Sequence, residues 1–76
     1  MVVLIDLQND YFDPRGKFYI PDTEELIQAL LARIRHANET GEPIIYTLNI
    51  YNQKDGRSKA ERDWAATLFE PFKALL

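Results

Sequence analysis

The sequence contains no cysteine, which excludes disulfides, a thiolate zinc site and a cysteine nucleophile within this chain. Positive charge is also scarce: nine Lys and Arg stand against twelve Asp and Glu, giving a net charge of −3 without any basic run. The chain therefore lacks the electrostatic footprint of a protein that binds nucleic acid or an anionic membrane. Its three glycines are isolated and form no phosphate-binding loop.

Long apolar runs are absent too. No stretch approaches the roughly 18 residues that a membrane-spanning helix needs, and Asp6 interrupts the first apolar run too early for a signal peptide. We therefore expect a cytoplasmic protein. With 76 residues, 46% of them apolar and 28% charged, the chain suits one small globular domain. A domain of this size buries only about 60% of its unfolded surface, so its stability is marginal.

The stretch that organises the chain is an apolar strand ending on a carboxylate. Residues 2–5 are continuously apolar, as in a strand covered on both faces of a parallel sheet, and Asp6 follows directly. Such sheets bind ligands beyond the carboxyl ends of their strands. A carboxylate placed there is either a cap for the turn over residues 7–10 or a general acid or base at the mouth of a site.

Two helices and a second strand are expected after this turn. Residues 21–25 predict a helix start, with Asp22 as the capping residue and Glu25 completing a capping box, and Gly41 predicts its end. The second strand is expected over residues 44–48. A capping box over residues 58–61 predicts another helix, which Pro71 should end or kink near residue 69 or 70.

A strand, a crossover helix and a second strand form a right-handed βαβ unit with parallel strands. The sequence thus predicts an α/β fold, a βαβα fragment of a doubly wound, Rossmann-like sheet. Because the carboxyl ends of parallel strands meet at one edge, Asn49 and Tyr51 should lie near Asp6. Residue type alone makes Asn49 a turn former and Phe12 a residue that packs the loop.

Residues 5–12, read IDLQNDYF, resemble the opening signature of the isochorismatase-like cysteine hydrolases, which include nicotinamidases, N-carbamoylsarcosine amidase and isochorismatase. The resemblance continues through Gly16, the helix and residues 43–47. It implies that residues 1–76 are the N-terminal part of one hydrolase domain, with a three-layer α/β/α architecture in the full family. It also implies that Asp6 is the catalytic acid or base, working with a Lys and usually a Cys from later strands. As an alternative to turn formation and loop packing, it implies that Asn49 contacts the substrate and that Phe12 lines the substrate pocket.

The resemblance also bears on substrates and cofactors. Its implied substrates are a small amide, cleaved through a thioester, or a vinyl ether, cleaved by acid catalysis without a cysteine. Metal-containing nicotinamidases have an Asp-x-His motif after the second strand, where this chain has Asn49, Ile50 and Tyr51. We therefore expect no catalytic metal and no cofactor.

Two strands and two helices leave both edges of the sheet unpaired. The chain is thus expected to be a piece of a larger domain, or to complete its sheet with further copies or a complementary chain. Three functions follow: part of a hydrolase that is inactive alone, a non-enzymatic module that oligomerises through its sheet edges, or a binding unit for a small polar ligand.

Overall fold

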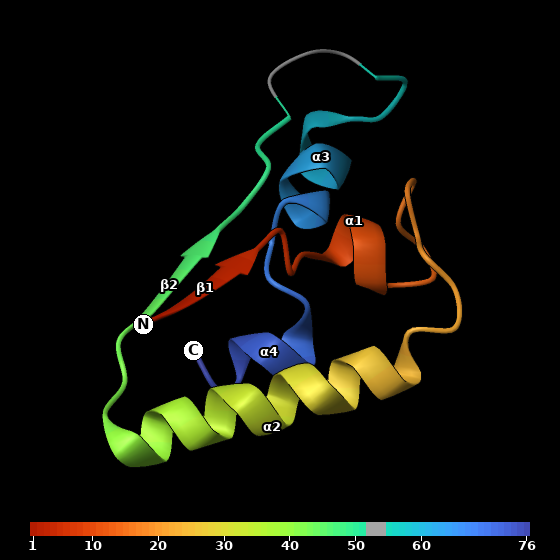
Figure 1. The fold of residues 1–76 in the computed structure, drawn as a ribbon. Helices are drawn as coiled ribbons and strands as arrows, with labels where there is room; N and C mark the ends of the chain where they lie inside the picture. The colour runs from red at the N-terminus through yellow and green to blue at the C-terminus, as the bar shows by residue number, and fades with distance from the viewer. Residues whose placement is uncertain (52–54) are drawn as a thin grey trace.

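The computed structural model describes residues 1–51 and 55–76. It contains two strands, β1 (Val2–Ile5) and β2 (Ile44–Thr47), which form a parallel sheet. Four helices accompany them: α1 (Asn9–Phe12), α2 (Glu24–Thr40), α3 (Lys59–Ala65) and α4 (Glu70–Lys73). The coarse prediction is confirmed: the fold is α/β, with a helical crossover between parallel strands (Figure 1).

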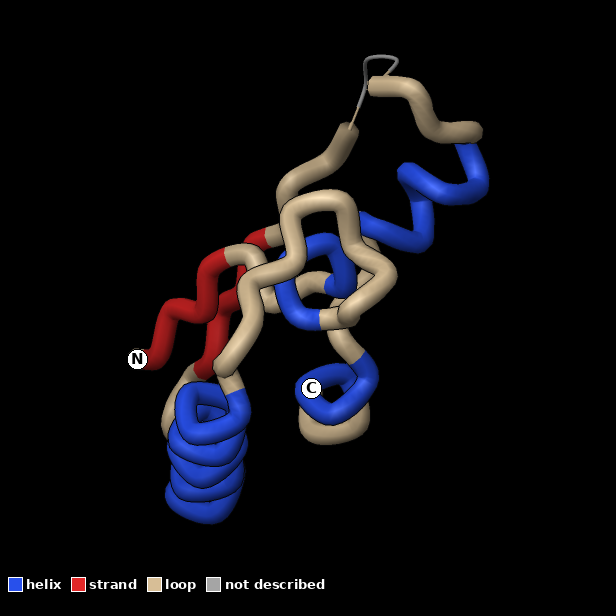
Figure 2. Tube along the Cα trace, turned by 90° about the vertical axis from the view of Figure 1, so that its right-hand side faces the viewer, coloured by secondary structure: helices blue, strands red, loops and turns tan. Residues whose placement is uncertain are grey.

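The sheet is covered on one face. Val2 and Leu4 are buried and belong to the same core cluster as Leu31, Ile34 and Ala37 of α2. Their neighbours Val3 and Ile5 point to the other face, as alternation along a strand requires, and remain 51% and 66% exposed. In Figure 1, α2 runs beneath both strands, and Figure 2, turned by 90°, shows α4 beside α2.

The long helix ends as predicted but begins differently. Gly41 adopts a left-handed conformation (φ 72°), and its N–H donates to the carbonyl of Ala37. The predicted cap at Asp22 is wrong: Asp22 itself has φ 59°, the N-cap is Thr23, and within the described residues no side chain caps this end. A left-handed residue at position 22 turns the chain before the helix starts, which moves the first helical residue to Glu24.

The last third of the chain departs from the prediction as well. The capping box between Ser58 and Glu61 is present, but α3 stops at Ala65. The next residues pair with the turn after β1, because Asn9 N–H donates to Thr67 O at 2.9 Å and Phe69 N–H donates to Leu7 O at 3.0 Å. Pro71 therefore lies in the first turn of α4, where its missing N–H costs little, and does not end α3.

Within residues 1–51 and 55–76, no helix is both long and apolar enough to cross a membrane.

Candidate functional site

Asp6 lies at the carboxyl end of β1, where the strand turns away from the sheet. Its N–H donates to Thr47 O at 3.1 Å and so closes the ladder between the two strands. Its backbone is left-handed (φ 58°), a conformation that is uncommon for a residue with a Cβ and that Asp and Asn adopt more often than other such residues. The residue is partly exposed. Of the side chains described, none caps the short helix α1 that follows, which weakens the interpretation of Asp6 as a cap.

Asn49 lies at the same edge of the sheet, just beyond β2, as predicted from the parallel pairing. It is exposed, and its side-chain Nδ2 donates to the hydroxyl of Tyr11 at 3.4 Å. Its main chain is bound by the side chain of Gln8, which is fully buried. Gln8 Oε1 accepts from Asn49 N–H at 2.7 Å, and Gln8 Nε2 donates to Asn49 O at 3.1 Å.

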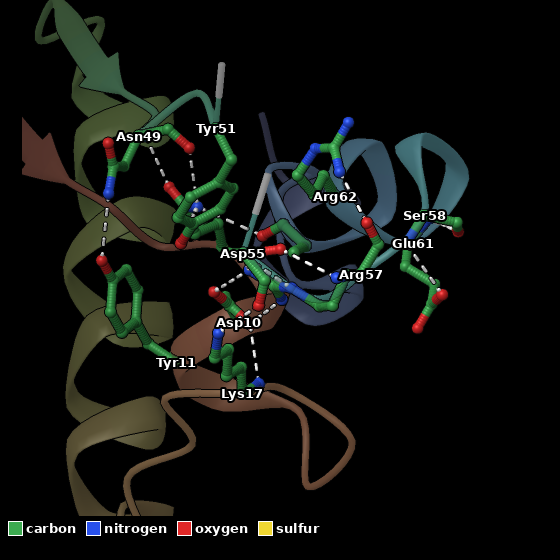
Figure 3. A network of polar contacts seen from close by, with 12 residues as sticks. Asp10, Tyr11, Lys17, Asn49, Tyr51, Asp55, Arg57, Ser58, Glu61 and Arg62 are labelled. Carbon is green, nitrogen blue, oxygen red and sulfur yellow. Dashed lines mark hydrogen bonds and ion pairs between the residues drawn. The ribbon is translucent and has the colours of Figure 1, made fainter. Parts of the chain in front are cut away.

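Figure 3 shows a network of polar contacts that includes Asn49 and a buried ion pair between Asp10 and Arg57. The carboxylate of Asp10 is fully buried and receives Arg57 Nη1 at 2.8 Å and Nη2 at 3.3 Å. Arg57 also donates to Asp55, from Nε at 2.9 Å and from Nη2 at 2.5 Å. The main-chain N–H of Lys17 adds a third donor to Asp10 at 2.8 Å. Arg57 thus links the segment that precedes α3 to helix α1.

These contacts control the protonation of the cluster. Burial alone would raise the pKa of Asp10, but hydrogen bonds from Arg57, Tyr51 and Lys17 outweigh it and hold that pKa below its ordinary value. Hydrogen bonding to Arg57 lowers the pKa of Asp55 to about 2. Burial, and then hydrogen bonds with Asp10 and Tyr11, raise the pKa of the Tyr51 hydroxyl. At neutral pH the two carboxyls are therefore ionised and the hydroxyl is neutral.

Gly16 lets the loop after α1 pass close to this cluster. A Cβ on Gly16 would overlap the main-chain carbonyl of Asp10, so no larger residue fits without a shift of the backbone. This close approach accompanies the hydrogen bond from the next residue, Lys17, to the Asp10 carboxylate.

Phe12 lies apart from the polar edge. Its ring stacks on Phe69, with centroids 5.9 Å apart, and meets the edge of Phe72 at 5.3 Å. The side chain is 9% exposed and belongs to the hydrophobic core. The structure thus brings Asp6 and Asn49 to one edge of the sheet and places Phe12 in the packing between α1 and α4.

Comparisons of this chain with protein-family models, with curated proteins and with solved structures find no match. The resemblance to the isochorismatase-like hydrolases therefore stays a prediction. In the part of the chain that the structure describes, no three His, Cys, Asp or Glu side chains are grouped to hold a metal ion.

Sequence reasoning singled out Asp6 and Asn49 but not Gln8, which binds Asn49, nor the buried ion pair between Asp10 and Arg57. A signal for two of these was present, because Gln8 and Asp10 are polar residues placed directly after a buried strand, where polar groups need partners. Arg57 carried no such signal, since its partner lies 47 positions away.

Proposed function

We propose that this chain is the N-terminal part of an isochorismatase-like hydrolase domain in which Asp6 is the general acid and base. The observation that carries the proposal is the left-handed Asp6 at the carboxyl end of a parallel strand, beside Asn49 at the end of the next one. Backbone strain at non-glycine residues clusters at active sites, and ligands bind at this edge of parallel sheets. The IDLQNDYF stretch supports the family on independent grounds.

The chemistry would divide between this chain and later strands. In amide hydrolysis, Asp6 takes the proton of a cysteine thiol supplied by those strands, and the thiolate forms a bond to the carbonyl carbon. Asp6 then gives the proton to the leaving amine, a thioester remains, and water cleaves it. In the vinyl-ether variant Asp6 protonates the substrate directly. The complete cytoplasmic domain would be a doubly wound sheet between two layers of helices, and residues 1–76 alone would show no turnover.

The test is a chimera that joins residues 1–76 to the later strands of an isochorismatase-like amidase that carry its Lys and Cys. We expect the chimera to hydrolyse the amidase's substrate, and Asp6→Asn to lower kcat by about 10² to 10⁴, the usual contribution of a general acid or base. Asp22→Asn is the matched control, because Asp22 is exposed and has nearly the same left-handed φ, 59°.

Two results would count against the hydrolase. One is a folded, active chimera in which Asp6→Asn is as active as Asp22→Asn. The other is a chimera whose two parts associate into a folded domain with no turnover, although the parent amidase is active in the same assay.

A second function is favoured by the uncovered face of the sheet. Val3, Ile5 and Ile45 are each at least half exposed on this face, and apolar patches of this kind mark interaction surfaces. As a non-enzymatic module, the chain would oligomerise through the edges and this face of its sheet. Sedimentation velocity would then show an oligomer that survives Asp6→Ala and is lost in Ile5→Lys. A folded monomer at high protein concentration would contradict this function.

A further inference from the structure

The hydrogen bonding between β1 and β2 continues beyond the point where the main chain of β1 leaves the sheet. The last main-chain bond runs from Asp6 N–H to Thr47 O. In a regular parallel ladder, Asn49 N–H would next donate to the carbonyl of residue 6, and Asn49 O would accept from the N–H of residue 8. The left-handed turn at Asp6 takes the main chain elsewhere, since Asn9 N–H and Leu7 O pair with the segment between α3 and α4.

The side chain of Gln8 takes over this pairing. Its carboxamide accepts from Asn49 N–H at 2.7 Å and donates to Asn49 O at 3.1 Å, in the places that the carbonyl of residue 6 and the N–H of residue 8 would take in a regular ladder. The second proton of Nε2 is directed to Ala65 O at 3.1 Å, with the Tyr51 hydroxyl at 3.3 Å. The side chain of Gln8 has no exposed surface, and its bond to Ala65 O is buried, so a residue that cannot form these bonds leaves at least one buried group without a partner.

We propose that Gln8 is the positioning residue of this edge: its carboxamide completes the sheet in place of the main chain, and thereby holds Asp6 in its left-handed conformation and fixes Asn49 beside it. Only a side chain that both accepts and donates at this reach can do so. Asn is one carbon shorter, an ionised Glu only accepts, and Met offers neither function. The catalytic importance of this positioning rests on the proposed function, but the positioning itself does not.

The test is NMR of the 76-residue chain, comparing wild type with Gln8→Met and with the matched control Gln28→Met on the exposed side of α2. In Gln8→Met we expect the amides of Asp6 and Asn49 to exchange about tenfold faster relative to those of Ile34 and Ala37, which report overall stability. The three-bond HN–Hα coupling of Asp6, which reports φ, should change as the left-handed population falls. Gln28→Met should change neither.

A measurement on the wild type keeps the proposal testable even if Gln8→Met does not fold. The side-chain amide protons of Gln8 should exchange at least about tenfold more slowly than those of Gln28, because only the former are buried and bonded. Equal rates would overturn the proposal. So would a folded Gln8→Met in which Asn49 loses protection while the exchange and the coupling of Asp6 stay unchanged.

The two proposals fail in different ways. None of the NMR measurements involves turnover, so an inactive chimera leaves the positioning role of Gln8 intact. In an active chimera, Gln8→Met should lower kcat about tenfold or more with little change in KM. If Asp6→Asn abolishes activity there while Gln8→Met keeps the wild-type kcat, the positioning role is overturned and the role of Asp6 stands.

Discussion

The guanidinium of Arg57 donates to both carboxyl oxygens of Asp10, at 2.8 and 3.3 Å, across 47 positions of sequence. Asp10 has no exposed surface and Arg57 is 13% exposed, so this pair is largely removed from water. A buried charge keeps its place in a fold only while its partner is present. The connection that carries Arg57 is therefore bound to α1 by one interaction with a large energetic consequence.

Removing this arginine should destabilise the chain severely. In Arg57→Met the carboxylate of Asp10 stays buried without its counter-charge, and breaking such a pair costs about 3–5 kcal/mol. We expect urea denaturation followed by circular dichroism to show this loss. Arg35→Met, on an exposed position of α2, should stay within about 0.5 kcal/mol of the wild type. Equal effects of the two substitutions would mean that the ion pair contributes little.

The same ion pair predicts how stability depends on pH. The folded-state pKa of Asp10 is lowered, and that of Asp55 is lowered to about 2 from an ordinary 3.8. As the pH falls, Asp10 and Asp55 are therefore protonated at a higher pH in the unfolded chain than in the folded chain. The stabilisation is complete above about pH 4 and is lost as the pH falls toward 2.

In Arg57→Met, Asp10 loses the hydrogen bonds and the charge of Arg57 that lower its pKa and keeps only those from Tyr51 and Lys17, so its pKa lies above that in the wild type. The difference in stability between wild type and Arg57→Met should then shrink as the pH is lowered from about 6 to about 3. Urea midpoints measured across this range test the expectation. A difference that stays constant with pH would show that the charge of Asp10 is not its source.

Phe12 should matter for stability, since its ring contacts both Phe69 and Phe72 in the core. We expect Phe12→Leu to lower the free energy of unfolding by about 1–2 kcal/mol through lost volume and lost aromatic contacts. Phe18→Leu is the matched control: Phe18 is 51% exposed, and its substitution should change stability by less than about 0.5 kcal/mol. If both variants unfold at the wild-type urea concentration, the aromatic cluster is not part of the stable core.

The features that could be predicted from the sequence are those determined by residues close together in the chain. Gly41 and the box between Ser58 and Glu61 act over a few residues, and both were predicted. The meeting of Asp6 and Asn49 followed from the parallel pairing of two apolar strands. These features need only spacing and residue type.

The rest depends on contacts distant in sequence. Helix α1 has four residues, too few to show a helical period, and was missed. The end of α3 is set by pairing of residues 67 and 69 with the turn after β1, which no local pattern reveals. The same is true of Gln8, whose partners lie 41 to 57 positions away. The buried residues around the site are therefore harder to predict from sequence than its exposed residues.

A last prediction concerns the backbone of Asp6. If this residue adopts a strained conformation for the sake of its side chain, a substitution that relieves the strain should increase the stability of the fold. Glycine adopts φ 58° without steric cost, whereas alanine pays about 1–2 kcal/mol for it. We expect Asp6→Gly to be more stable than Asp6→Ala by about 1 kcal/mol, measured by urea denaturation.

The same pair of substitutions at Asp22, with φ 59°, should give a similar difference. Similar differences would mean that the strain comes from the backbone conformation and not from the carboxylate. The carboxylate at position 6 would then have a different role, which we propose is general acid and base catalysis. If Asp6→Ala is as stable as Asp6→Gly while the pair at Asp22 differs, position 6 has relaxed out of the left-handed conformation, and strain no longer supports the site.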